Sequence, residues 1–238
     1  MRFSIDYEER IIEFEVQYRK RKTLSIQIDL DSNIKVISPM GITEKRIKDI
    51  VKSKGKWINK KLLEFEDINK NKVEKKFEDG DKLLYLGEEY LLRICIEKNL
   101  GNKYKIEIQN GEIKLYLSNY SKDLIKNILK SWYKQKTEER AKERIKMYQK
   151  YFSEVPTKIK AKEQKRRWAS CTSKREILIN WRCIMASEEA FDYIIVHEMC
   201  HMKHMNHSKD FWNLVEYILP DYKLRKEYLK KNSMKMDL

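Results

Sequence analysis

The stretch YIIVHEMCHMKHMNH, residues 193–207, decides the fold of the C-terminal half of the chain and holds all of its histidines. His197 and His201 are four residues apart, which is about one helical turn, so both imidazoles project from one face of a helix. Glu198 lies between them and leans toward the same side. Two imidazoles can bind one metal ion, and a carboxylate that does not bind the metal can act as a general base. The stretch therefore predicts a helix that carries a hydrolytic metal site.

The surroundings of this motif favour the metal site over two simpler interpretations. The residues before it, Tyr193 to Val196, are apolar, so the helix is expected to be buried, where an unpartnered histidine or glutamate would be costly. The simpler interpretations are a surface helix with a histidine-rich end, or a core pair of histidines hydrogen-bonded to the backbone. The concentration of every histidine of the chain in one segment favours the metal.

A catalytic zinc needs a third protein ligand, and His204 and His207 are the candidates. His204 returns to the same helical stripe but lies about 10 Å along the axis from His197, too far for one ion. If the helix ends near Asn206, a residue that tolerates the left-handed conformation, His207 can turn back toward the metal. We therefore predict zinc held by His197, His201 and His207. Acidic alternatives occur farther on, at Glu216 and Glu227, where solvated helix charges are the simpler interpretation.

Glu198 is predicted to accept a proton from the attacking water and to donate it to the leaving group. The groups that stabilise the oxyanion cannot be read from spacing; Arg167, Asn180 and Tyr193 are candidates, with packing or surface roles as alternatives. Cys200 is expected to be a small buried hydrophobe beside the motif.

The charge balance allows contact with nucleic acid. The chain has 52 basic and 37 acidic residues among 238, a formal net charge of +15, and clusters at Arg19–Lys22 and Lys165–Arg167. Such a balance attracts polyanions, although in a lysine-rich chain each cluster can equally be a solvated surface. The alternative function is therefore a nucleic-acid-associated protein, or a protease recruited to DNA, whose metal is mainly structural.

The four cysteines are far apart and form no Cys-x-x-Cys pair, which argues against a disulfide framework or a thiolate zinc site. Charges interrupt every apolar run near the N-terminus, so no signal peptide is expected, and no stretch is long enough to span a bilayer. We expect a cytoplasmic protein with no membrane partner.

Local patterns predict an α+β protein. Alternating strands are expected at 11–18, 24–30 and 34–38, then helix from Glu44 to Phe65, interrupted at Gly55, then a solvated loop from Asp67 to Lys76. Further strands are expected at 83–86, 90–96, 104–108 and 113–117, the last two joined by a turn at Asn110-Gly111. These strands are predicted to form an antiparallel, β-rich lobe over residues 1–120, with no internal repeat.

The periodicity becomes helical after Ser121, where we place the domain boundary. A long helix is expected over 122–151, then strands at 158–164 and 177–181, and a helix that begins after Ser187 and runs into the histidine stretch. Residues 121–238 are thus predicted to form the hydrolase domain.

Three stretches resemble a known family: RKTLSIQIDLDSNIKVISPMGITEKRIKDIVKSKGKWINKKL (21–62), RRWASCTSKREILINW (166–181) and YIIVHEMCHMKHMNHSKDFW (193–212). Together they are similar to the YgjP-like predicted metal-dependent hydrolases, also called metallopeptidase-like. At the motif level they also resemble SprT-like and Wss-type proteases, which act on proteins attached to DNA. The resemblance implies a zincin-type fold core and a hydrolase, and we expect a protein or peptide substrate for a metallopeptidase. It also implies that His197, His201 and His207 bind the metal and that Glu198 is the catalytic carboxylate.

Overall fold

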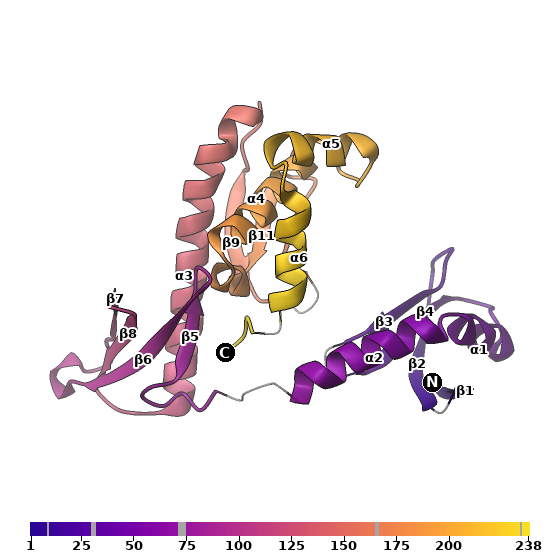
Figure 1. Cartoon of the computed structure of the whole chain (residues 1–238), viewed down its shortest axis with the longest axis horizontal. Coiled ribbons are helices and arrows are strands. Elements are labelled where there is room, and N and C mark those ends of the chain that lie inside the picture. Colours follow the sequence, from indigo (N-terminus) through magenta and orange to yellow (C-terminus); the bar gives the residue numbers. More distant parts are fainter. Residues whose placement is uncertain (9, 30–31, 71–74, 165–166, 234) are drawn as a thin grey trace. The chain divides into compact units, whose positions relative to one another are not determined.

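The chain forms two compact units, Met1–Val73 and Glu74–Leu238, in the computed structural model (Figure 1). The structure describes residues 1–8, 10–29, 32–70, 75–164, 167–233 and 235–238. The predicted α+β class is confirmed. The division between units falls within the lysine-rich run 67–76, whereas the boundary predicted near Ser121 lies inside the second unit. Of that run, residues 67–70 are helical, and residues 71–74 lie outside the described residues.

The N-terminal unit contains a four-stranded sheet with the order β1-β2-β4-β3. The strands are β1 (Arg2–Tyr7), β2 (Arg10–Arg19), β3 (Ser25–Ile28) and β4 (Ile34–Pro39). β1 and β3 pair antiparallel with their neighbours, but β2 and β4 are parallel. The prediction of an antiparallel lobe is wrong here because β4 returns from the edge strand β3 and inserts beside β2, so it runs in the direction of β2.

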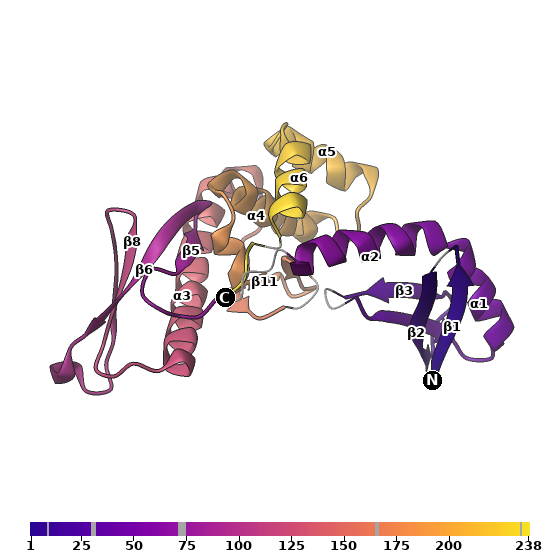
Figure 2. The same cartoon turned by 60° about the horizontal axis from the view of Figure 1, so that its bottom comes forward.

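Helices α1 (Glu44–Ser53) and α2 (Gly55–Lys70) complete this unit, with α1 against β1 and α2 against β3 (Figure 2). The Thr43 hydroxyl accepts a hydrogen bond from the backbone N–H of Arg46 and so begins α1 as predicted. Alternation along β2 and β4 turns one side of the sheet inward, and the helices cover it. The core residues are Ile5, Ile12, Phe14, Val16, Ile34, Val36, Ile47, Val51, Ile58 and Leu62.

The C-terminal unit begins with a second four-stranded sheet, of order β5-β6-β8-β7. Its strands are β5 (Lys82–Tyr85), β6 (Glu88–Ile96), β7 (Lys105–Gln109) and β8 (Glu112–Leu117), and a short 3-10 helix, η1 (Lys98–Leu100), follows β6. β6 and β8 are parallel, so this sheet is also mixed. The predicted turn between β7 and β8 is confirmed, since Asn110 and Gly111 both have positive φ, 52° and 74°.

The remaining elements surround a three-stranded sheet of order β10-β11-β9, in which β9 and β11 are parallel. The strands are β9 (Lys158–Lys162), β10 (Ala169–Cys171) and β11 (Glu176–Asn180). The helices are α3 (Lys122–Tyr148), α4 (Glu188–Lys203), α5 (Lys209–Ile218) and α6 (Tyr222–Asn232), with 3-10 turns η2 (Gln149–Tyr151) and η3 (Trp181–Met185). Within the described residues, every helix is too short or too polar to cross a membrane.

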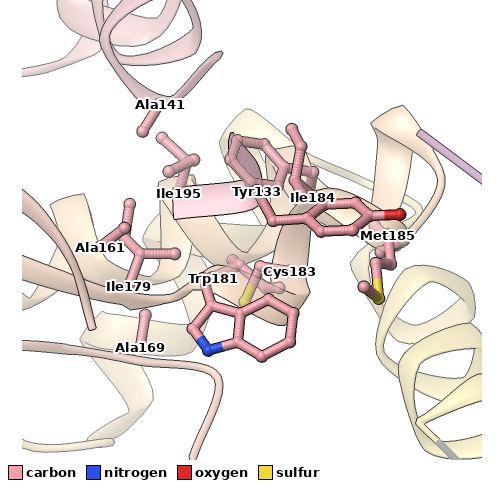
Figure 3. Packing of buried hydrophobic residues seen from close by; sticks show 14 of the residues in the cluster. Tyr133, Ala141, Ala161, Ala169, Ile179, Trp181, Cys183, Ile184, Met185 and Ile195 are labelled. Carbon is pink, nitrogen blue, oxygen red and sulfur yellow. The ribbon is translucent and has the colours of Figure 1, made fainter. Parts of the chain in front are cut away.

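The long helix α3 joins the second sheet to the rest of this unit. Tyr133 on α3 is fully buried, and its hydroxyl donates a hydrogen bond to the Leu84 carbonyl of β5 at 2.8 Å. Its ring centroid lies 5.9 Å from that of Trp181 on η3. Figure 3 shows both rings in a cluster of buried side chains that includes Ile195 of α4. One continuous core therefore runs from the second sheet to α4.

The β5–β6 turn lies directly against the start of α4. The Leu86 N–H donates a hydrogen bond to the Ile184 carbonyl at 2.8 Å. At Gly87, with a φ of +85°, an added Cβ would lie 2.9 Å from the Cα of Ser187. Only a residue without a side chain allows this approach, so the turn positions the residue from which α4 begins.

Candidate metal centre

Helix α4 positions His197, Glu198 and His201. It begins as predicted at Ser187, whose hydroxyl accepts a hydrogen bond from the Ala190 N–H, and Glu188 and Glu189 lie at the positive end of the helix dipole. The helix is buried from Ala190 to Val196. The motif therefore lies on a rigid element, as a metal site requires.

The end of α4 differs from the prediction. The helix ends at Lys203 rather than near Asn206, and His204 is the capping residue, with an extended backbone at φ −129° and ψ 97°. Asn206 does not adopt a positive φ. The early end has a physical reason: the turned His204 carbonyl lies 3.0 Å from Nδ1 of His201 and can accept its proton. That hydrogen bond leaves Nε2 of His201 as the free lone pair.

Leaving the helix at Lys203 brings His207 back to α4. One ligand atom from each of His197, His201 and His207 lies within 4.8 Å of the others, and the Nε2 atoms of His197 and His207 are 3.0 Å apart. Ring nitrogens at tetrahedral zinc, about 2.0–2.1 Å from the ion, would have comparable spacings. His204, whose backbone is extended, is not in this group. These three donors therefore fit a divalent metal ion.

Aromatic side chains of helix α5 pack against His207 and hold it in place. Ser208 caps this helix through a hydrogen bond from the Phe211 N–H. The buried Phe211 ring has its centroid 4.6–4.9 Å from those of His197, His201 and His207, and the Trp212 ring stacks on His207 at 5.6 Å. These aromatic contacts restrict the orientation of each of the three imidazoles.

His197 and His207 have lowered pKa values, which favour the neutral form that metal binding needs. Burial, followed by the charges of His201, His207 and Lys226, lowers the pKa of His197 to about 3. The pKa of His207 is lowered by the same kinds of cause, burial first and then His201 and Lys226. Neutral rings present lone pairs to a shared cation.

Glu198 is 5% exposed and lies on the side of α4 that faces β10. Burial raises the pKa of its carboxyl to about 7, opposed by a hydrogen bond from the Cys171 backbone N–H and by the charge of Arg167. Its Oε2 atom is buried and has no hydrogen-bond partner among the described residues. A buried carboxylate with an unused oxygen and a pKa near neutrality is suited to accept and release a proton.

A family model for the YgjP-like metallopeptidase domain matches residues 22–232. This chain belongs to that family. Membership makes it a metal-dependent peptidase at the level of the family, and it implies a divalent metal and a protein or peptide substrate. The resemblance seen in the sequence is thereby confirmed.

Among solved structures, the chain is similar to the metallopeptidase zymogen abylysin of Pyrococcus abyssi. The two are 24% identical, the match covers 40% of this chain and 93% of that one, and the TM-score is 0.36. No curated protein gives a significant match.

The other candidate residues of this YgjP-like domain separate into two groups. The Asn180 side chain is buried and already hydrogen-bonded within the protein. Its amide N–H donates a hydrogen bond to the Gln164 carbonyl, and its Oδ1 accepts one from the Arg182 N–H. Glu216 and Glu227 pair with Lys223 and Lys231 and do not join the histidine group. By contrast, Arg167 and Tyr193 lie close enough to Glu198 for mutual electrostatic effects.

Tyr193 and Cys200 occupy the same buried helix. The Tyr193 ring packs edge-on against His197 at 5.7 Å and stacks on Tyr222 of α6. Burial raises the pKa of Tyr193 to about 12, so its hydroxyl stays protonated and can only donate or accept a hydrogen bond. Burial also raises the pKa of Cys200 to about 12, in keeping with the expected role of a small hydrophobe.

Asp192 anchors α4 to its neighbours and was not identified from the sequence. It is 5% exposed, pairs with Arg144 of α3, accepts a hydrogen bond from Tyr148 at 2.8 Å, and lies 3.9 Å from Arg225 of α6. A carboxylate in an otherwise apolar helical stretch was the one available signal. Its partners are 33 to 48 residues away in sequence, which is why periodicity could not reveal them.

Proposed function

We propose that this chain is a zinc-dependent peptidase in which His197, His201 and His207 hold the ion and Glu198 is the general base, within a zincin-like lobe. The observation that carries the proposal is the convergence of three imidazole nitrogens within 4.8 Å, beside a buried carboxylate whose Oε2 has no partner among the described residues. Hydrolytic zinc is typically held by neutral imidazoles, with a nearby glutamate that does not bind the ion.

Zinc, when bound, supplies a Lewis acid that activates water and polarises the substrate carbonyl. Glu198 accepts the proton of the attacking water and transfers it to the leaving amine. The Cys171 N–H and the burial of the side chain keep this carboxylate oriented with its pKa near the working pH. Arg167, whose charge acts on Glu198, and the Tyr193 hydroxyl, whose ring packs against His197, are candidates to stabilise the oxyanion.

The decisive experiment combines metal analysis with cleavage of a peptide library. The wild type should contain about one zinc per chain and cleave peptides. Glu198→Gln should keep the zinc and lose activity by a factor of at least about 100, because one proton-transfer group is removed. The matched control is Glu216→Gln, on an exposed side chain of α5, which should leave both measurements unchanged. Equal activity of Glu198→Gln and wild type would disprove the mechanism.

The choice of ligands has its own test. His207→Ala removes a donor and should lose zinc, whereas His204→Ala should retain it. The reason is that residue 204 contributes its backbone carbonyl to His201, and alanine keeps that carbonyl. Retention of zinc by His207→Ala together with its loss from His204→Ala would show the assignment wrong.

Contact with nucleic acid stays a prediction of the sequence. In the cluster Arg19–Lys22, the side chains of Arg19, Lys20 and Lys22 are exposed, and Arg21 donates to Ser25. Of the cluster Lys165–Arg167, the first two residues lie outside the described residues. Binding of DNA that falls steeply with salt would support this partner, and a flat response would remove it. The predicted cytoplasmic location is likewise a proposal.

A further inference from the structure

Two cationic side chains flank the candidate metal centre on different elements. Lys226 of α6 has its Nζ 5.0 Å from the centroid of the Trp212 ring, and that ring in turn stacks on His207. Arg167 precedes β10, the strand whose Cys171 N–H binds Glu198, and its charge acts on that carboxylate. One cation thus lies beside the third imidazole and the other lies beside the catalytic carboxylate.

Neither cation is neutralised by the protein. Six other arginines of the C-terminal unit form ion pairs: Arg93, Arg140, Arg144, Arg175, Arg182 and Arg225. Among the described residues, no carboxylate lies within 4.0 Å of the Arg167 guanidinium or of the Lys226 ammonium, and both side chains are exposed. Their charges are therefore open to solvent next to the candidate metal centre.

Lys226 differs from the other lysines that lie over aromatic rings, such as Lys223 over Tyr222, because its ring partner, Trp212, stacks on His207. The face of Trp212 attracts its ammonium, an interaction that localises a lysine that would otherwise move freely in solvent. Its field reaches both His197 and His207. A substrate bound at the metal would meet this positive charge whatever its sequence, and a carboxylate there would be favoured over an amide or an ammonium.

We propose that Lys226 and Arg167 are specificity-determining residues that select acidic peptides, each binding a carboxylate on one side of the scissile bond. This inference rests on the proposed function, since it names the substrate class of the same site. Both groups are solvent-exposed, so each contributes an amount typical of surface ion pairs, up to about a fivefold effect on affinity at low salt. The preference weakens as salt screens the charges.

The test is a binding measurement on the full-length, zinc-loaded Glu198→Gln protein, in which cleavage does not interfere. The probes are two dye-labelled alanine octapeptides, one with glutamate and one with glutamine at the second position on each side of the central bond. Fluorescence anisotropy should show tighter binding of the glutamate peptide. Adding Lys226→Gln should weaken that peptide about fivefold and leave the glutamine peptide unchanged, whereas Arg167→Gln should weaken the glutamate peptide about fivefold more than it weakens the glutamine peptide.

The matched control is Lys231→Gln, which removes the same charge from α6 at a lysine already paired with Glu227 at 3.2 Å. It should leave both peptides unchanged. Equal affinity for the two peptides, no binding of either, or an equal loss in Lys231→Gln would overturn the inference. Cleavage of peptides by the wild type is measured separately. If the wild type cleaves peptides but shows no preference for acidic ones, the inference is wrong and the proposed function stands. If the Glu198→Gln protein binds the acidic peptide more tightly but the wild type cleaves no peptide, the proposed function is wrong.

Discussion

The two four-stranded sheets of this chain share one plan but are stabilised differently. Each has two antiparallel outer pairs around a parallel central pair, in the orders β1-β2-β4-β3 and β5-β6-β8-β7, and each is followed by a helix with a hydroxyl cap, Thr43 or Ser121. The sequence shows no detectable repeat, so the likeness is one of topology.

The difference lies in what covers each sheet. The first sheet encloses its own core with α1 and α2, and the buried residues described in that core run from Ile5 to Leu62. The buried residues of the second sheet, such as Leu92 and Leu115, belong to a core that continues through α3 to α4. The same arrangement of strands is therefore a complete unit in one place and a support for the metal centre in the other.

The largest expected effect comes from cutting the chain. Residues 1–70 and residues 75–238 should each fold alone, because each contains a whole core, whereas residues 75–120 should not, because their apolar face needs α3. Circular dichroism and amide dispersion in NMR spectra of the three fragments check this. A folded 75–120 fragment would show that the two sheets do not differ in this respect.

Single core truncations should separate the units thermally. Ile58→Ala in the first core and Leu115→Ala in the second remove fully buried side chains, and each should cost about 2–5 kcal/mol. Calorimetry should show that each lowers a different transition. Only Leu115→Ala should lower the transition that zinc raises, and a shared shift in both variants would indicate one cooperative core.

The contact between the β5–β6 turn and α4 can be tested with two glycines. Gly87→Ala combines a positive φ with a Cβ 2.9 Å from the Ser187 Cα, and should cost about 2–4 kcal/mol. Gly80→Ala has a similar φ of +88° but open space around the Cβ, so about 1 kcal/mol is expected. Equal losses of unfolding free energy would mean that the turn does not restrain α4.

A smaller effect concerns the metal-free protein between pH 6.5 and 4.5. The pKa of His197 is lowered from 6.5 to about 3 in the folded protein, so the folded state binds this proton more weakly than the unfolded state does. The resulting stabilisation is complete above pH 6.5 and is lost progressively as the pH falls below 6.5. The pKa of Glu198, raised from 4.5 to about 7, contributes in the opposite sense, since its stabilisation is present below 4.5 and is lost as the pH rises toward 7. The two contributions therefore oppose each other.

Glu198→Gln should reveal the histidine contribution. With chelator present, its second unit should lose stability on acidification more steeply than wild type, by up to about 1.4 kcal/mol per pH unit. Denaturant unfolding at several pH values measures both slopes. The first unit contains no histidine and gives an internal reference. Parallel slopes for variant and wild type would contradict the opposed contributions.

The local elements were predictable from the sequence because their signals lie within a few residues. The caps at Thr43, Ser121 and Ser187 and the Asn110-Gly111 turn each depend on neighbouring backbone groups. Strand β1 was missed although Phe3, Ile5 and Tyr7 alternate with polar residues, which is the period-two pattern of a strand. The parallel central pairs were missed because local alternation does not distinguish parallel from antiparallel pairing.

The candidate site divides in the same way. The spacing of His197, Glu198 and His201 is a local property of a helix, whereas the end of that helix at Lys203, before His204, was not predicted. The contacts of Glu198 with Cys171, of His207 with Trp212 and of Trp212 with Lys226 join separate elements, and no pattern in the sequence encodes them. The boundary predicted near Ser121 depends on a change of periodicity, and local periodicity does not distinguish a loop within a unit from a loop between units.

The carbonyl of residue 204, which orients the His201 ring, belongs to the main chain. Side-chain replacement at positions 202–206 leaves that carbonyl in place, but inserting or deleting one residue would move either the carbonyl or the His207 ring. The segment between His201 and His207 is therefore constrained in its length more than in its composition.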